Sequence, residues 1–325
     1  MNTSRFLLLG GIALLVMIAG LAIGSVPLGA RELVAALARP DSPSALIVRD
    51  LRLPRVLLAF LVGGGLGVAG AALQALVRNP LADPYLLGLS GGAGLGAVLA
   101  IALDTGAAWA VPLAAFAGSL AAVGLVYRLA VVSGRRLDPR VLLLAGVVVG
   151  AFASAIMSAI IVLSDAPQLR NAFVWLLGGL GMASWQSLAL FALYAVVPLA
   201  VLWIVARHLD LLAQGEETAA HLGANPERVK RIVYIAASLL TAASVATCGI
   251  IGFVGLVIPH AVRQAWTPLH RVLLPASFLL GGTFLVLADV LARSVLRPIE
   301  LPVGVVTALV GVPLFALLLR RTLTP

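Results

Sequence analysis

The sequence predicts an all-α protein that crosses a membrane many times. Of its 325 residues, 62% are hydrophobic and only 11% are charged, and the mean hydropathy is +1.11. This composition excludes an ordinary water-soluble domain. Apolar stretches fill the chain and are separated by short breaks that are basic or rich in proline. We therefore expect a single transmembrane domain over residues 1–325.

The apolar stretches predict the spans in order, since a helix needs about 20 apolar residues to cross a bilayer. The first stretch exceeds the apolar core of a signal peptide and no clear cleavage site follows it, so it is interpreted as a span. A stretch near 256–266 is too short to cross alone. The other spans are predicted near residues 6–29, 55–77, 85–103, 109–131, 141–163, 186–206, 231–249, 271–292 and 303–319.

Basic residues predict the orientation. With a cytoplasmic N-terminus and ten passes, most of the 22 Lys and Arg residues fall on cytoplasmic segments, as the positive-inside rule requires. The net charge of +9 is explained by this topology and by lipid headgroups, so no nucleic acid partner is expected. The single cysteine, Cys248, rules out a disulfide framework and is interpreted as a packed small side chain.

Two breaks lie at membrane depth in corresponding halves of the chain. The first has the sequence RNPLADP, at residues 78–84, and the second is GIIGFVGLVIPH, at 249–260. Irregular backbone survives in a bilayer only where protein buries it or where it lines a cavity. Paired breaks of this kind mark the route through a transporter. The sequence therefore predicts a transport pathway.

Nucleotide motifs give a negative result. A P-loop needs Gly-Lys-Ser/Thr, and the chain's only lysine, Lys230, lies in Arg-Val-Lys-Arg. The chain is therefore not expected to be an enzyme, and any ATP and magnesium would be bound by a partner. The run 65–70 matches G-x-G-x-x-G, but it lies inside an apolar helix. Its small residues are interpreted as points where helices approach closely.

Asp289 is the one acidic residue well inside a predicted span. It is interpreted either as a structural partner of Arg293, four residues on, or as a substrate or proton site. No predicted helix carries the series of Asp, Glu and His residues expected of a proton-coupled carrier. A stand-alone proton-coupled secondary transporter nevertheless remains the alternative to an ATP-driven importer.

Five motifs give the chain a family resemblance. They occur in order over nearly the whole sequence, at residues 48–96, 142–150 (LLLAGVVVG), 215–223 (GEETAAHLG), 252–263 (GFVGLVIPHAVR) and 300–313 (ELPVGVVTALVGVP). With these motifs the chain resembles the permeases of type II ABC importers, which take up vitamin B12, haem and ferric siderophores.

The resemblance implies an assembly in the bacterial inner membrane. It implies about ten helices per subunit, with inverted repeats formed by spans 2–5 and 7–10, and a homodimer with a central path. Two ATP-binding cassette subunits would bind on the cytoplasmic side and a substrate-binding protein on the periplasmic side. The permease itself would hold no cofactor and no metal.

The cytoplasmic insert 207–231 is expected to contact the ATPase. Glu216 and Glu217 open a short helix that Leu222 and Gly223 end, and a proline at 226 begins a second helix. Two short helices at a right-angled turn would form a compact plug. In the family this loop docks into the ATPase, which assigns coupling to Glu216, Glu217, Ala220, Leu222 and Gly223. An exposed loop without a partner is the alternative.

The family also implies contacts at the periplasmic end. Arg52, Arg55, Arg293 and Arg297 would receive acidic side chains of the binding protein, since guanidinium groups suit carboxylates. Contact with lipid headgroups is the alternative. Arg170 and Trp175 belong to a segment that resembles a short helix facing the path.

A cytoplasmic gate is expected at the breaks after spans two and four. Asn79 and Leu81 match the first break, while Pro139 and Arg140 stand where the vitamin B12 permease carries small hydroxyl residues. Both Asn79-Pro80 and Asp138-Pro139 are expected to end helices.

The cargo is expected to travel as an intact chelate, because the path-facing helices carry no cluster of metal ligands. The string GGLGMASW at 178–185 favours cobalamin slightly over ferric siderophore or haem.

Overall fold

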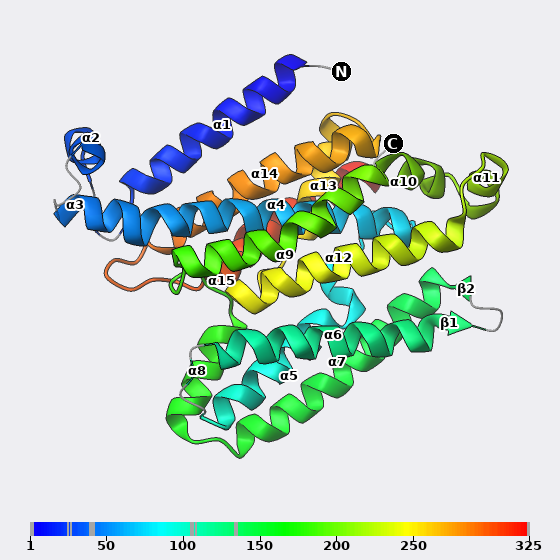
Figure 1. Cartoon of the computed structure of the whole chain (residues 1–325), viewed down its shortest axis with the longest axis horizontal. Coiled ribbons are helices and arrows are strands. Elements are labelled where there is room, and N and C mark those ends of the chain that lie inside the picture. Colours follow the sequence, from blue (N-terminus) through cyan, green and yellow to red (C-terminus); the bar gives the residue numbers. More distant parts are fainter. Residues whose placement is uncertain are drawn as a thin grey trace.

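The computed structural model describes residues 3–24, 26, 28–38, 43–104, 107, 109–132 and 136–323. They form a bundle of helices (Figure 1). The elements are α1 (Thr3–Ala22), α2 (Ala30–Ala38), α3 (Pro43–Leu46), the π-helix η1 (Ile47–Arg52), α4 (Leu53–Leu76), the 3-10 helix η2 (Pro84–Leu87), α5 (Leu89–Ala102), α6 (Ala110–Ala130), β1 (Val131–Val132), β2 (Arg136–Leu137), α7 (Pro139–Val162), α8 (Ala166–Leu176), α9 (Trp185–Ile204), α10 (Ala206–Ala213), α11 (Glu216–His221), α12 (Pro226–Cys248), α13 (Val254–Ala265), α14 (His270–Ala292) and α15 (Val303–Leu323).

The predicted multi-pass architecture is confirmed. Within the described residues, 7 helices are long and apolar enough to cross a membrane. Shorter apolar helices are α5 and the Val303–Leu318 part of α15. The stretch near 256–266, predicted to be too short to cross alone, forms the 12-residue α13. The ten apolar segments predicted from the sequence correspond to α1, α4, α5, α6, α7, α9, α12, α13, α14 and α15.

The first span is shorter than predicted, since α1 ends at Ala22 rather than near residue 29. The guanidinium group of Arg52 caps this end of the helix. Its Nη1 donates to the carbonyl oxygens of Leu21 and Ala22, at 2.7 and 2.9 Å. These carbonyls lie in the last turn and accept no hydrogen bond within the helix, so Arg52 satisfies them from outside it, together with the Leu28 N–H that donates to Ala22 at 3.1 Å.

Figure 1 places α2, α3 and α8 at one end of the bundle, and α11 and the β1–β2 hairpin at the opposite end. The predicted orientation makes the end with α11 cytoplasmic. The hairpin is a small departure from the all-α prediction: Val131 pairs with Leu137 and Val132 with Arg136, antiparallel. Arg39 and Arg135, two of the basic residues counted for the predicted orientation, lie outside the described residues.

Close helix packing explains the glycine runs. α4 is buried along most of its length and packs along α14. A Cβ at Gly63 would overlap the carbonyl of Gly281, and one at Gly67 would lie 2.6 Å from the carbonyl oxygen of Ser277. On α5, Gly92 faces Gly118 of α6 in the same way. The interpretation of these glycines as points of close helix approach is confirmed.

Candidate translocation and coupling sites

The first break follows the end of α4. Arg78 has a left-handed backbone, with φ 51°. The Oδ1 atom of Asn79 accepts from the Leu81 N–H at 2.9 Å, and Asp83 caps η2 by accepting from the Tyr85 N–H at 2.8 Å. These side-chain bonds hold an irregular backbone in one conformation.

The second break lies between α12 and α13 and contains two residues with positive φ, Gly249 (69°) and Phe253 (70°). It meets the first break directly. The Tyr85 hydroxyl donates to the carbonyl oxygen of Ile251 at 3.1 Å and accepts from its N–H at 3.3 Å. The two breaks predicted from sequence therefore touch, although 166 residues separate Tyr85 from Ile251.

Gln74 of α4 contacts both breaks. Its side chain is buried, and its Nε2 lies 3.3 Å from the carbonyl oxygen of Ala82 in the first break. The same atom lies 3.4 and 3.3 Å from the carbonyl oxygens of Gly255 and Leu256 at the start of α13. Arg263 of α13 donates to its Oε1 at 3.0 Å. Sequence reasoning missed Gln74, whose isolated polar side chain in an apolar helix was the available signal.

The end of α8 approaches the second break from the other side. The Gly179 N–H donates to the carbonyl oxygen of Cys248 at 2.8 Å. Trp175 is partly buried and packs against small apolar residues of α5, α6 and α12. Arg170 is exposed on α8. That these two residues face the path stays a prediction.

Two of the four arginines predicted to dock a binding protein, Arg55 and Arg293, form an ion-pair network inside the subunit. Asp289 is fully buried. Its carboxylate lies 2.9 Å from Arg55 Nη2 and 3.2 Å from Arg293 Nε. Arg55 also pairs with Glu300 at 3.0 Å. The structural pairing of Asp289 with Arg293 is confirmed, and Arg55 is a second partner that the sequence did not indicate.

This network changes how the docking prediction has to be tested. Arg52 and Arg293 are only 5% and 3% exposed. Both donate to backbone carbonyls of the α1 segment, Arg52 to Leu21 and Arg293 to Gly20 at 2.6 Å. An alanine at either position would therefore disturb α1 as well as any docking. Arg297 is exposed, so its substitution would test docking without disturbing α1. The docking role itself stays a prediction.

One part of the predicted gate is wrong in its local structure. Asp138-Pro139 does not end a helix but begins α7, because α6 already stops at Ala130 and the hairpin intervenes. Asp138 accepts from the Arg140 N–H at 2.7 Å as the N-cap, and proline suits the first helical position. Leu81 and Arg140 are exposed in the subunit. Their role at a gate stays a prediction.

The coupling insert agrees with the sequence in its first helix and differs in its second. α11 begins at Glu216, and Leu222 caps its end before Gly223, which has φ 84°. The helix begun by Pro226 is not short: it is α12, a 23-residue span. The short helices of the insert are thus α10 and α11, and the predicted second short helix at Pro226 is instead the start of a span. Leu222 is 60% exposed.

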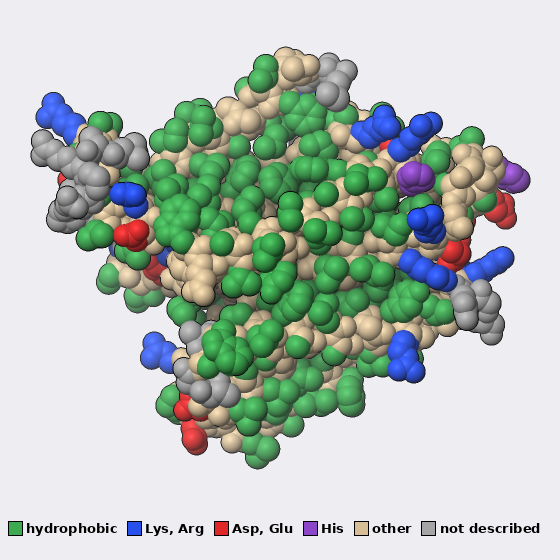
Figure 2. Space-filling view, viewed as in Figure 1, with side chains coloured by type: hydrophobic (Ala, Val, Ile, Leu, Met, Phe, Trp, Pro, Cys, Tyr) green, Lys and Arg blue, Asp and Glu red, His purple; other side chains and the backbone are tan. Residues whose placement is uncertain are grey.

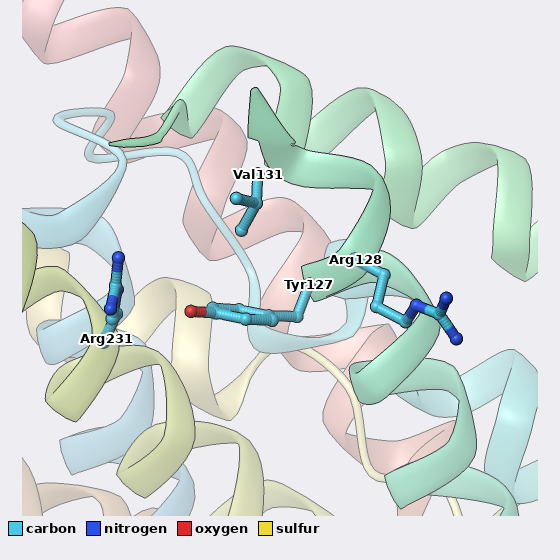
Figure 3. A pocket seen from close by; sticks show the side chains of 4 residues that line it. All are labelled: Tyr127, Arg128, Val131 and Arg231. Carbon is cyan, nitrogen blue, oxygen red and sulfur yellow. The ribbon is translucent and has the colours of Figure 1, made fainter. Parts of the chain in front are cut away.

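A pocket of about 330 Å³ lies beside this end of the bundle, lined by Tyr127, Arg128, Val131 and Arg231. In Figure 3 the Tyr127 hydroxyl points toward Arg231, while Arg128 extends in the opposite direction. Figure 2 shows basic side chains gathered at the same end of the molecule. Between the two ends of the molecule the visible surface is mainly hydrophobic, as expected for a face within a bilayer.

The apolar helices and the two paired breaks in contact define a multi-pass transport permease. The chain belongs to the FecCD transport family, which matches residues 12–321.

Relatives agree with this assignment. The chain is 46% identical to the cobalamin import system permease protein of Halobacterium salinarum, over 84% of this chain and 73% of the relative. It is 44% identical to an uncharacterized ABC transporter permease of Bacillus subtilis, over 85% of this chain and 79% of the relative. It is 43% identical to the vitamin B12 import system permease of Salmonella paratyphi A, over 85% and 84%.

Solved structures share the fold. An inward-facing ABC transporter assigned to the metal-chelate type aligns with a TM-score of 0.89 and 29% identity, over 98% of this chain and 100% of that one. The PsaBC complex of Streptococcus pneumoniae aligns with a TM-score of 0.55 and 19% identity, over 81% and 89% of the two chains, which shows likeness of fold alone.

Proposed function

We propose that this chain is the permease subunit of a bacterial inner-membrane ABC importer that carries an intact cobalamin-type chelate into the cytoplasm. It would work as a homodimer with two ATPase subunits and a periplasmic binding protein. The observation that carries the choice of cargo is the identity of 46% and 43% to permeases named for cobalamin and vitamin B12 import. The GGLGMASW string favours the same cargo over ferric siderophore or haem.

The chemistry of the path supports passage of an intact chelate. Within the residues that the structure describes, no group of three or more His, Cys, Asp or Glu side chains could hold a metal ion. The breaks are held by hydrogen bonds between backbone groups and the side chains of Tyr85 and Gln74. A wall of this kind binds cargo weakly, so affinity for the chelate would reside in the binding protein.

The source of energy would be a separate ATPase, which would bind the ATP and magnesium. The sequence has no P-loop lysine, because Lys230 lies outside any such motif. Exposed Leu222 at the end of α11 offers an apolar contact for the ATPase. No specific observation favours the proton-coupled alternative, and Asp289, its best candidate, is held by two arginines.

The test is reconstitution in proteoliposomes with the ATPase and the binding protein that assemble with this chain. Uptake of labelled cyanocobalamin is compared with uptake of haem and of a ferric siderophore, with ATP or a proton gradient as the only energy source. We expect ATP-dependent cyanocobalamin uptake that requires all three components. Uptake of haem or siderophore alone would overturn the cargo, and uptake by the isolated chain on a proton gradient would overturn the importer.

A further inference from the structure

Lys230, the chain's only lysine, occupies an unusual position. It lies on the first turns of α12 and its side chain is only 2% exposed. An ammonium group has three N–H donors, and three groups accept from it here. They are the carboxylates of Glu216, at 3.0 Å, and Glu227, at 2.6 Å, and the carbonyl oxygen of Leu137, at 2.6 Å. The buried charge is therefore fully partnered.

The three partners come from different parts of the chain. Glu216 is the first residue of α11, the helix predicted to contact the ATPase. Glu227 lies on α12 itself, and its second oxygen accepts from the Leu137 N–H at 2.9 Å. Leu137 belongs to β2 and is completely buried. The Leu137 carbonyl oxygen thus accepts from Lys230, and the Leu137 N–H donates to Glu227.

Leu137 directly precedes the start of α7. The next residue, Asp138, is the N-cap of that helix, and Pro139 and Arg140 are the residues predicted at the cytoplasmic gate. A continuous set of short contacts therefore runs from the first residue of α11 through the ammonium group of Lys230 to the beginning of α7.

The charges make Lys230 the centre of this connection. Its two acidic partners are partly exposed, with side chains 35% and 27% accessible. Without the ammonium group, two like charges would face each other and the Leu137 carbonyl would lose its donor. A buried polar group left unpaired is costly, so the three segments would separate rather than keep this geometry.

We propose that Lys230 is a positioning residue that transmits movement of α11 to the start of α7. It would make the gate segment follow the ATPase-facing helix. This inference rests on the proposed function, because it gives the ATPase-driven movement a physical route within the permease. The contacts that carry it, Lys230 to Glu216 and Lys230 to Leu137, are both made by one ammonium group.

The experiment follows the two ends of the route separately in the complex of permease and ATPase. A spin label at exposed Thr218 reports on α11, and one at exposed Arg136 reports on the segment before α7. Each label is introduced singly, so that the distance is measured between the two copies of the permease. Distances are compared without nucleotide and with ATP and vanadate.

Lys230→Met and Glu216→Gln are the test variants. Glu216→Gln removes only the charged link to α11 and leaves Lys230 with Glu227 and Leu137. If the Lys230→Met complex fails to assemble, Glu216→Gln therefore tests the role of Lys230. Arg228→Gln is the matched control, because Arg228 is an exposed cation on the same helix. We expect both labels to move with nucleotide in the unmodified chain and in the control.

In the test variants the label at 218 should still move, while the movement at 136 should fall by about half or more. Full movement at position 136 in a folded Glu216→Gln or Lys230→Met complex would overturn the role of Lys230. Failure of the unmodified chain to bind the ATPase, or absence of nucleotide-dependent movement at 218, would overturn the proposed function instead.

Discussion

Replacing Asp289 with alanine tests how a charged network is stabilised near the end of α14. The carboxylate is fully buried and pairs with both Arg55 and Arg293. Its removal leaves a buried Arg293 guanidinium with no acidic partner of its own. Breaking a buried ion pair from one side costs about 3–5 kcal/mol.

The structure places the expected loss of stability at the lower end of this range. Arg55 keeps Glu300, and Arg293 keeps the carbonyl of Gly20. We therefore expect Asp289→Ala to lower the free energy of unfolding by about 3 kcal/mol. The matched control is Glu300→Gln, whose side chain is 40% exposed and whose loss should cost about 0.2–1 kcal/mol.

The assay is equilibrium unfolding of the purified chain in detergent, followed by far-ultraviolet circular dichroism. Asp289→Ala combined with Arg293→Met should recover part of the loss, because the second change removes the uncompensated charge. An Asp289→Ala chain no less stable than Glu300→Gln would refute the reasoning. It would show that water reaches this network and screens it.

Three further predictions concern coupling, the gate and helix packing. Changing Glu217 and Leu222 to arginine should abolish ATP-dependent uptake in proteoliposomes, because the exposed end of α11 would no longer fit the ATPase. The chain should still insert in the membrane. Unchanged uptake would contradict this prediction. Leu81→Cys, at an exposed position, should crosslink the two copies in a nucleotide-dependent manner and block uptake; no crosslink in any state, with uptake preserved, would place the exit elsewhere. Gly63→Leu should lower the free energy of unfolding by about 1–3 kcal/mol in the unfolding assay, because its Cβ would overlap a carbonyl of α14. The control is Gly10→Leu on α1, which should be nearly neutral because nothing lies within 4 Å of an added Cβ. Equal losses of stability would refute the packing argument.

The sequence by itself determined the class of protein and the order of its spans. Length and hydropathy set the spans, since each must match the thickness of the bilayer. Local signals also sufficed where the cause was local. Glu216, Leu222 and Gly223 predicted the bounds of α11, because a helix end depends on residues next to one another in the chain. The glycine run in α4 predicted that another helix approaches closely, but not that this helix is α14.

Only the tertiary structure decided which distant residues meet. Asp138-Pro139 looked like the end of a helix, yet the hairpin before it makes it the start of α7. The pairing of Arg55 with Asp289, and of Lys230 with Leu137, joins residues 234 and 93 positions apart. No local pattern encodes such pairs, because a buried charge is satisfied by whichever partner the packed helices bring within hydrogen-bonding distance.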